Sequence, residues 1–306
     1  MKVLLLTQGG TAASDQCARL TAALKHLPSM NSLLVLGEAG AAEPLRSLSG
    51  VERLLHAEIP EPILVTRWAR SLAQWIGAQE FSHILMASDS FGKDLLPHLA
   101  ALLDRAMVSE VVAIESSNRV IRASHAGAVW QTVESQQRPL LMTLRTSAFA
   151  PEVSGTPLQV ERVTLSQHSC GSEVLSQQAL PLSRPRLHSA EIVIGVGRGV
   201  ASAQMPLIEA LADQLGAAIG GSRGAVDLRL VDNAVQIGQS GAIIAPRLYI
   251  AVGISGADQH LAGIKDAGIV VAIDTDEQTP LMQWADYALQ GDISQCLPDL
   301  IALLKK

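Results

Sequence analysis

Short apolar runs alternate along the chain with longer stretches in which apolar residues recur every three or four positions. Runs of the first kind are typical of buried strands, and stretches of the second kind are typical of helices that cover a sheet. The pattern therefore predicts βα units around parallel sheets. In the first half, strands are expected at residues 2–6, 33–36, 83–87, 108–114, 120–124 and 140–144. Helices are expected at residues 14–27, 64–75 and 95–103.

The apolar pattern breaks near the middle of the chain. From about residue 167 to 190, Ser, Gln, Pro and His replace it, and Pro181 and Pro185 interrupt any regular element. We therefore expect an α/β protein with two domains, 1–186 and 187–306, each a mainly parallel sheet with flanking helices. In the second domain, strands are expected at residues 191–195, 248–252 and 268–273, and helices at 203–215, 257–264 and 298–304.

Composition and charge narrow the function classes. A chain of 306 residues has room for two cores of ordinary size, and 24 glycines suit the close packing of strands and helices. The net charge of −6 and the lack of a long basic run give nucleic-acid binding little electrostatic support. Three isolated cysteines, Cys17, Cys170 and Cys296, suit a reducing compartment and argue against a disulfide framework or a closed zinc site.

No apolar run approaches the ~20 residues of a membrane span. The best candidate, residues 243–254, is broken by Pro246 and Arg247. The chain opens on an apolar run, residues 1–6, that is too short and too weakly basic for a secretion signal. We therefore expect a bacterial cytoplasmic protein that does not insert into membranes.

A first candidate for chemistry is the turn Gly195-Val196-Gly197-Arg198-Gly199, which follows a predicted strand and precedes a helix. Free backbone N–H groups and the helix dipole can receive a phosphate at such a turn. Val200 occupies the third glycine position of the dinucleotide fingerprint, and no acidic residue follows at the distance needed to hold a ribose. The segment therefore does not match the standard NAD-binding fingerprint. A nucleotide site of another design and a merely tight turn both stay open, and Arg198 favours the first.

Three further polar segments lie in the same half. Residues 221–224, Gly-Ser-Arg-Gly, are expected to end a helix, and alone they are typical of a surface turn. Residues 236–241 are polar and Gly-rich, and residues 253–260 run from a strand into a helix. Ser255 could be a plain helix cap, and His260 alone is more often a satisfied buried histidine. Three such segments at strand ends, however, are where α/β sheets place ligands.

Residues 245–263, APRLYIAVGISGADQHLAG, resemble the signature of electron-transfer flavoprotein α subunits. The resemblance continues through residues 271–274 and 285–287, and backward through 221–223 and 197–199. The resemblance is specific over residues 184–306. In the first half of the chain it is looser, and residues 91–97 carry most of it. It implies a C-terminal FAD-binding domain, and an N-terminal domain that packs against a β subunit that usually binds AMP.

The resemblance also implies one FAD per heterodimer. The residues implied to bind it are Arg198, Ser222, Arg223, Ile237, Gly238, Gln239, Ser240, Ser255, Gly256, Ala257, Asp258, Gln259, His260, Asp274, Asp292 and Ile293. Arg198 and Ser222 would contact the dinucleotide, Arg223 would lie against the isoalloxazine, the Ser240 hydroxyl would be near N5, and His260 would face the pyrimidine edge. One-electron reduction places negative charge on the N1–O2 region of a flavin, and cationic guanidinium and imidazole groups would stabilise that charge.

By resemblance, the chain is a one-electron carrier and not an enzyme with its own organic substrate. It would accept electrons from the acyl-CoA dehydrogenases of fatty-acid β-oxidation and related enzymes, and pass them to a membrane electron-transfer flavoprotein:quinone oxidoreductase. Three departures from the family pattern stand out. Ser240 replaces the usual Thr, Asp258 replaces an uncharged residue, and Asp274 replaces Asn at the adenosine end, which Asp292 would also serve.

The two added carboxylates keep a second hypothesis open. A carboxylate repels a diphosphate and can only accept hydrogen bonds, so the chain could instead be a nucleotide-binding regulatory or assembly protein without a redox role. A third class, a NAD-dependent hydrolase or transferase, lacks an obvious pair of nucleophile and base.

Overall fold

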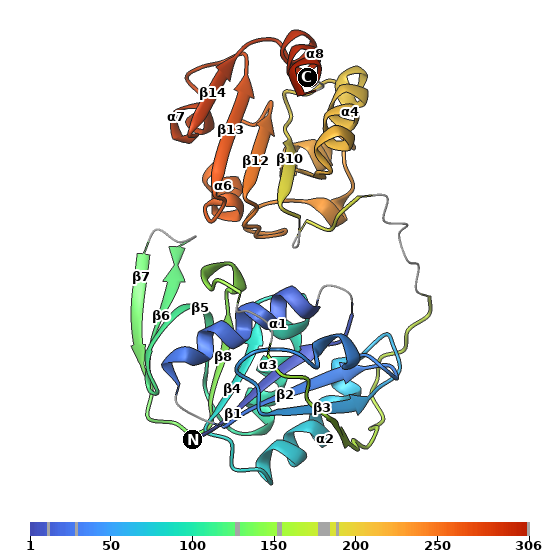
Figure 1. Ribbon diagram of the computed structural model, residues 1–306, viewed down its shortest axis with the longest axis vertical. Helices are drawn as coiled ribbons and strands as arrows, with labels where there is room; N and C mark the ends of the chain where they lie inside the picture. The colour runs from blue at the N-terminus through green and yellow to red at the C-terminus, as the bar shows by residue number, and fades with distance from the viewer. Residues whose placement is uncertain are drawn as a thin grey trace. The chain divides into compact units, whose positions relative to one another are not determined.

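The computed structural model describes residues 1–10, 13–27, 30–125, 129–151, 155–176, 184–187 and 190–304. The chain divides into two compact units, Met1–Ala179 and Leu180–Lys306. Each unit holds a mainly parallel sheet with helices on both faces (Figure 1). The α/β fold class and the two-sheet architecture expected from the sequence are confirmed.

Among the described residues, the first unit holds a nine-stranded sheet in the order β7-β6-β5-β8-β4-β1-β2-β3-β9. Its strands are β1 (Lys2–Gln8), β2 (Met30–Gly37), β3 (Arg53–Glu58), β4 (His83–Ala87), β5 (Met107–Ser116), β6 (Arg119–Ser124), β7 (Val129–Glu134), β8 (Leu140–Leu144) and β9 (Val160–Val163). Only the β5–β6 and β6–β7 pairs are antiparallel within this part of the chain. Strands β4 and β8 are buried along their whole length, which explains their continuous apolar sequences.

Helices cover both faces of this sheet. Helix α1 (Ala13–Ala22) packs Cys17 and Leu20 on one face, beside the inward side chains Leu5 and Val35. Helices α2 (Val65–Gly77) and α3 (Ser90–Leu102) pack against the other face. Short 3₁₀ turns complete the unit at η1 (Ala23–His26), η2 (Glu43–Leu45) and η4 (Thr146–Ala148). The face of each helix therefore follows the apolar stripe in its sequence.

The second unit holds a parallel sheet in the order β11-β10-β12-β13-β14. Its strands are β10 (Ile192–Val196), β11 (Ala218–Gly221), β12 (Leu248–Val252), β13 (Ile269–Asp274) and β14 (Tyr287–Gln290). Its helices are α4 (Met205–Leu215), α5 (Arg223–Asp227), α6 (Asp258–Ile264), α7 (Pro280–Trp284) and α8 (Ile293–Leu304), with 3₁₀ turns η5 (Ser202–Gln204) and η6 (Asn233–Val235). Side chains of α4 and α8 cluster with one face of the sheet, and those of α6 and α7 with the other.

Three local expectations are corrected by the structure. Gly221 ends strand β11, and residues 222–224 begin helix α5, so the segment does not end a helix. Pairing with β10 makes a strand of a Gly-rich segment whose own β propensity is low. Gly195 was expected in the turn after the strand, but it lies inside β10. The last helix was expected to begin at Pro298, but α8 begins at Ile293, so Pro298 lies inside it. Strands β3, β7, β9, β11 and β14 were not expected.

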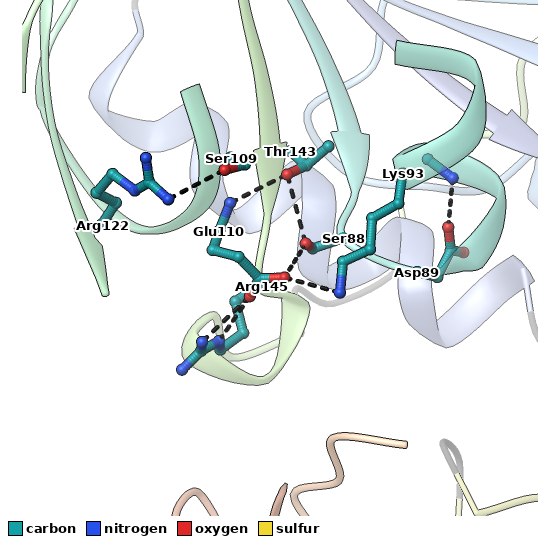
Figure 2. Close-up of polar contacts among 9 residues, drawn as sticks. Ser88, Asp89, Lys93, Ser109, Glu110, Arg122, Thr143 and Arg145 are labelled. Atoms are coloured by element: carbon teal, nitrogen blue, oxygen red, sulfur yellow. Dashed lines mark hydrogen bonds and ion pairs between the residues drawn. The ribbon is translucent and has the colours of Figure 1, made fainter. Parts of the chain in front are cut away.

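A polar network joins the carboxyl ends of β4 and β8 to Glu110 of β5 (Figure 2). Glu110 stands in β5 at a register shift, with a backbone φ of 59°. Its carboxylate accepts from the Ser88 hydroxyl at 2.6 Å and from the Lys93 ammonium at 2.9 Å. Arg145 donates to the other carboxylate oxygen at 3.1 Å. The Glu110 amide donates to Thr143 Oγ1 at 3.0 Å, so backbone and side chain are both held.

The Glu110–Arg145 pair of this network is largely shielded from water, whereas the Lys93 side chain is half-exposed. The side chains of Arg145 and Glu110 are 11% and 19% exposed. Burial opposes ionisation of Glu110, but hydrogen bonds from Ser88 and Lys93 and the charges of Lys93 and Arg145 outweigh it, so the pKa of Glu110 lies below its ordinary value. An ionised Glu110 therefore stabilises the folded first unit at neutral pH.

Candidate functional site

A cleft of about 480 Å³ opens where strands β10, β11 and β12 end. Most residues implied by the sequence resemblance come together on its wall. Those that line it are Arg198, Ser222, Arg223, Ile237, Gly238, Gln239, Ser240, Ser255, Gly256, Ala257, Gln259, His260 and Asp274. The cleft lies at the carboxyl edge of a parallel sheet, the usual place for ligands in such folds.

Backbone contacts fix the loops after β10 and β12 against each other. The Gly199 amide donates to the Gly253 carbonyl at 3.0 Å, and the Gly197 amide donates to the Val252 carbonyl at 2.8 Å. A Cβ on Gly197 would lie 1.8 Å from the Gly253 carbonyl oxygen. Only glycine permits this approach, which explains the Gly-rich sequence of the loop.

The loop at residues 236–241 joins the other two. The Ile237 amide donates to the Gly221 carbonyl at 2.8 Å, and the Gln239 amide donates to the Gln259 carbonyl at 2.7 Å. The Ser240 hydroxyl accepts from the Gln236 side-chain amide at 3.2 Å. One loop therefore ties the end of β11 to helix α6 across the cleft.

The two arginines on the cleft wall are held by different contacts. Arg223 forms an ion pair with Asp227 at 3.1 Å, and its side chain is 74% exposed. Ser222 caps α5 by accepting from the Ala225 amide at 3.3 Å. Arg198 also lines the cleft, and its Cβ lies close beside Gly224. Two guanidinium groups thus border one open cleft, which favours an anionic ligand.

His260 is the most buried titratable group on the cleft, at 6% exposed. Its Nε2 lies 2.8 Å from the Tyr249 hydroxyl. Nδ1 is buried and makes no hydrogen bond of normal geometry among the described residues, although the Ile237 carbonyl lies near the ring. Burial lowers the pKa of His260 to about 4, and the nearby Ile237 carbonyl offsets only part of that effect. The imidazole expected to be cationic is therefore neutral at pH 7 in the free chain, where it acts through hydrogen bonding.

Three residues implied by the resemblance do not line the cleft. Asp258 is exposed in the first turn of α6. Asp292 accepts from the Ser294 amide at 2.6 Å at the start of α8, and Ile293 is buried in the core beneath that helix. Their contact with a cofactor stays a prediction, and these positions give it no geometric support.

The cleft also has lining residues outside the expected set. These are Gly199, Gly224, Gln236, Gly253, Ile254, Asp276 and Thr279. Asp276 and Thr279 follow β13, so the strand-end rule used for the other loops could have found them. The Thr279 hydroxyl oxygen is buried without a partner in the described part of the chain. It is therefore a second buried polar atom of the cleft wall, with His260 Nδ1, whose hydrogen-bonding capacity is unused in the described part of the chain.

The donor set fits an organic anion with several hydrogen-bonding groups. The cleft volume lies within the range of about 300–1,000 Å³ common for cofactor sites. Two guanidinium groups beside the Gly-rich loops at the strand ends suit an anionic dinucleotide such as FAD. Within the described residues, no three His, Cys, Asp or Glu side chains are grouped as metal ligands, and no helix is long and apolar enough to cross a membrane.

Two segments of the chain match family models. Residues 14–168 match the electron transfer flavoprotein domain, and residues 186–265 match the electron transfer flavoprotein FAD-binding domain. The second match contains the loops after β10, β11 and β12 that form the cleft.

Named relatives match over nearly the whole chain. Electron transfer flavoprotein subunit alpha of Pseudomonas aeruginosa is 38% identical over 98% of this chain and 99% of its own length. The subunit of Paracoccus denitrificans is 38% identical over 99% and 100%, and the mitochondrial subunit of Arabidopsis thaliana is 35% identical over 99% and 88%. A family 9 glycosyl transferase structure from Veillonella parvula covers 100% of this chain and 89% of its own, at 11% identity and a TM-score of 0.30, too low to carry an argument. The chain belongs to the electron transfer flavoprotein family, among its α subunits.

Proposed function

We propose that the chain holds one FAD in the cleft of its second unit and, paired with a β subunit, carries single electrons between other proteins. In this role it takes electrons from acyl-CoA and related dehydrogenases, passes them to a membrane quinone oxidoreductase, and has no organic substrate of its own. The supporting observation is that the loops after β10, β11 and β12 line one cleft with two arginines and a buried histidine.

FAD, when bound, supplies the one-electron chemistry, and the residues of the cleft hold and tune it. Arg198 and Ser222 would bind the dinucleotide, Arg223 would lie beside the ring, and His260 would donate a hydrogen bond. The first unit would pack against the β subunit, which would hold AMP, in a cytoplasmic complex. These assignments rest on family membership together with the cleft geometry.

The competing functions make different demands on the cleft. A hydrolase or transferase needs a nucleophile beside a base, but the hydrogen-bond partner of His260 in the described residues is Tyr249. A regulatory protein without a redox role draws support from Asp274 and Asp276, whose carboxylates share the cleft with the arginines. Asp258, the other carboxylate that raised this hypothesis, lies off the cleft wall.

Copurification separates the redox role from the regulatory one. Expressed with its β subunit, the full chain should yield a yellow complex with FAD near a one-to-one ratio, and an acyl-CoA dehydrogenase with its substrate should bleach it. Flavin absorbance and extracted FAD are the measurements. A colourless complex that takes up no added FAD would contradict the carrier role and favour the regulatory one.

Arg223→Ala should make the bound flavin harder to reduce. Loss of a cation beside the ring removes a favourable interaction with the incoming charge. Because Arg223 is exposed and paired with Asp227, solvent and the carboxylate screen it, and we expect the first-electron potential to fall by about 60 mV, near 1.4 kcal/mol. Spectroelectrochemical titration of the purified complex measures this shift.

Asp227→Asn tests the same interaction with the opposite sign, since it removes the screening partner of Arg223 and should raise the potential. Arg247→Ala is the matched control, because Arg247 is exposed, lies 3.9 Å from Glu191 and does not line the cleft. Equal potentials for Arg223→Ala and Arg247→Ala would place Arg223 away from the flavin.

A further inference from the structure

Tyr249 is a buried residue behind the wall of the cleft. It lies in the central strand β12 with no exposed surface, and its hydroxyl bonds to His260 Nε2 at 2.8 Å. The two rings are tilted by 42°, with centroids 6.1 Å apart. His260 borders the cleft and Tyr249 does not. The tyrosine can therefore reach a ligand only through the histidine.

Hydrogen-bond satisfaction decides which way this bond runs. Burial raises the pKa of Tyr249 above its usual value, so the hydroxyl keeps its proton. Within the described structure its hydrogen bond is the one to His260. Were the hydroxyl only to accept, its own proton would be buried unpaired, at a free-energy cost. Donation to Nε2 avoids that cost, and a neutral imidazole that accepts at Nε2 carries its proton on Nδ1.

We infer that Tyr249 is a positioning residue that holds His260, a residue of the cleft wall, as the Nδ1-protonated tautomer, in which the neutral ring is an N–H donor. Nδ1 is buried and makes no hydrogen bond of normal geometry in the described chain, the Ile237 carbonyl lies near the ring, and the side chain borders the cleft. The ligand group this donor suits is a carbonyl oxygen or ring nitrogen that gains negative charge. The identity of that ligand as flavin rests on the proposed function, whereas the tautomer itself does not.

Gly195 provides the space that this arrangement needs. It lies in β10, opposite Ala251 of β12, and a Cβ at this position would lie 1.8 Å from the Tyr249 hydroxyl oxygen. Gly195→Ala should therefore displace the hydroxyl while leaving the tyrosine and the histidine chemically intact. It tests the same contact as Tyr249→Phe by a separate route.

The first test reads the tautomer directly, without flavin. In the full-length flavin-free chain labelled with ¹⁵N in the histidine rings, the His260 signals, assigned by their loss in His260→Gln, should show a protonated Nδ1 and an unprotonated Nε2. In Tyr249→Phe and Gly195→Ala the population should shift toward the Nε2-protonated form. Tyr287→Phe is the matched control, because Tyr287 is the other tyrosine of the chain and is 67% exposed.

A second measurement asks whether the tautomer matters to the ligand. FAD affinity of the complex with the β subunit should fall about tenfold in Tyr249→Phe and Gly195→Ala, the loss expected for one hydrogen bond, and should not change in Tyr287→Phe. A protonated Nε2 in the unsubstituted chain, or an unchanged tautomer in both variants, would overturn the inference. Failure of every form to bind FAD would instead contradict the proposed function and leave the tautomer result standing.

Discussion

Gly197→Ala is expected to abolish FAD retention, with an affinity at least about 100-fold below that of the unsubstituted complex. The added Cβ would lie 1.8 Å from the Gly253 carbonyl oxygen and 2.6 Å from the Ile254 amide nitrogen. Both neighbours are backbone atoms, so no side chain can turn aside to make room. The loops after β10 and β12 must separate, and the cleft they form together changes shape. FAD content after gel filtration and the dissociation constant from flavin fluorescence measure the loss.

A glycine with free space is the control for this substitution. Gly77, at the end of α2 in the first unit, has no atom within 4 Å of a built Cβ. Gly77→Ala should keep full FAD binding, and its unfolding midpoint should stay equal or rise slightly because alanine favours helix. A Gly197→Ala complex that still elutes with one FAD would show that the contact between the two loops is dispensable.

The fold was most predictable from sequence where strands are buried on both faces. Strands β4, β8 and β12 have the predicted bounds, because a strand covered by helices must be apolar throughout and stops where polar residues begin. Strands β14 and β7 lie at sheet edges with mostly exposed residues, so their sequences carry no such run. Strand β11 contains two glycines and exists through its pairing with β10, which no local pattern encodes.

The sequence indicated which segments form the site, but not which side chains within them lie close together. Polar Gly-rich stretches after strands indicated ligand loops, and most residues that line the cleft belong to these stretches, whereas their contact with FAD stays a prediction. The sequence did not predict the pairing of Tyr249 with His260, because Tyr249 stands in it only as one residue of an apolar strand. The neutrality of His260 also follows from tertiary burial, which a sequence pattern does not measure.

Glu110→Gln is expected to lower the free energy of unfolding of the first unit by about 2 kcal/mol, a roughly 30-fold change in the unfolding equilibrium. Glutamine keeps the shape of the side chain but not its charge, so Arg145 and Lys93 lose their common counter-charge. Arg145 is well shielded, and a shielded cation without a partner is costly. Glu161→Gln is the control, because its pair with Arg53 is exposed to water and contributes at most about 1 kcal/mol.

Urea unfolding should be followed by tryptophan fluorescence in a Trp284→Phe background, since the other three tryptophans, Trp68, Trp75 and Trp130, all belong to the first unit. The pH dependence gives a second check. The folded pKa of Glu110 lies below its unfolded value, so its stabilising effect is present above the unfolded pKa and is lost as pH falls through the folded one. The gap in stability between the unsubstituted chain and Glu110→Gln should therefore be constant near neutrality and close in acid. A gap that persists at low pH would mean that the substitution acts through packing or backbone strain at the left-handed position and not through the charge.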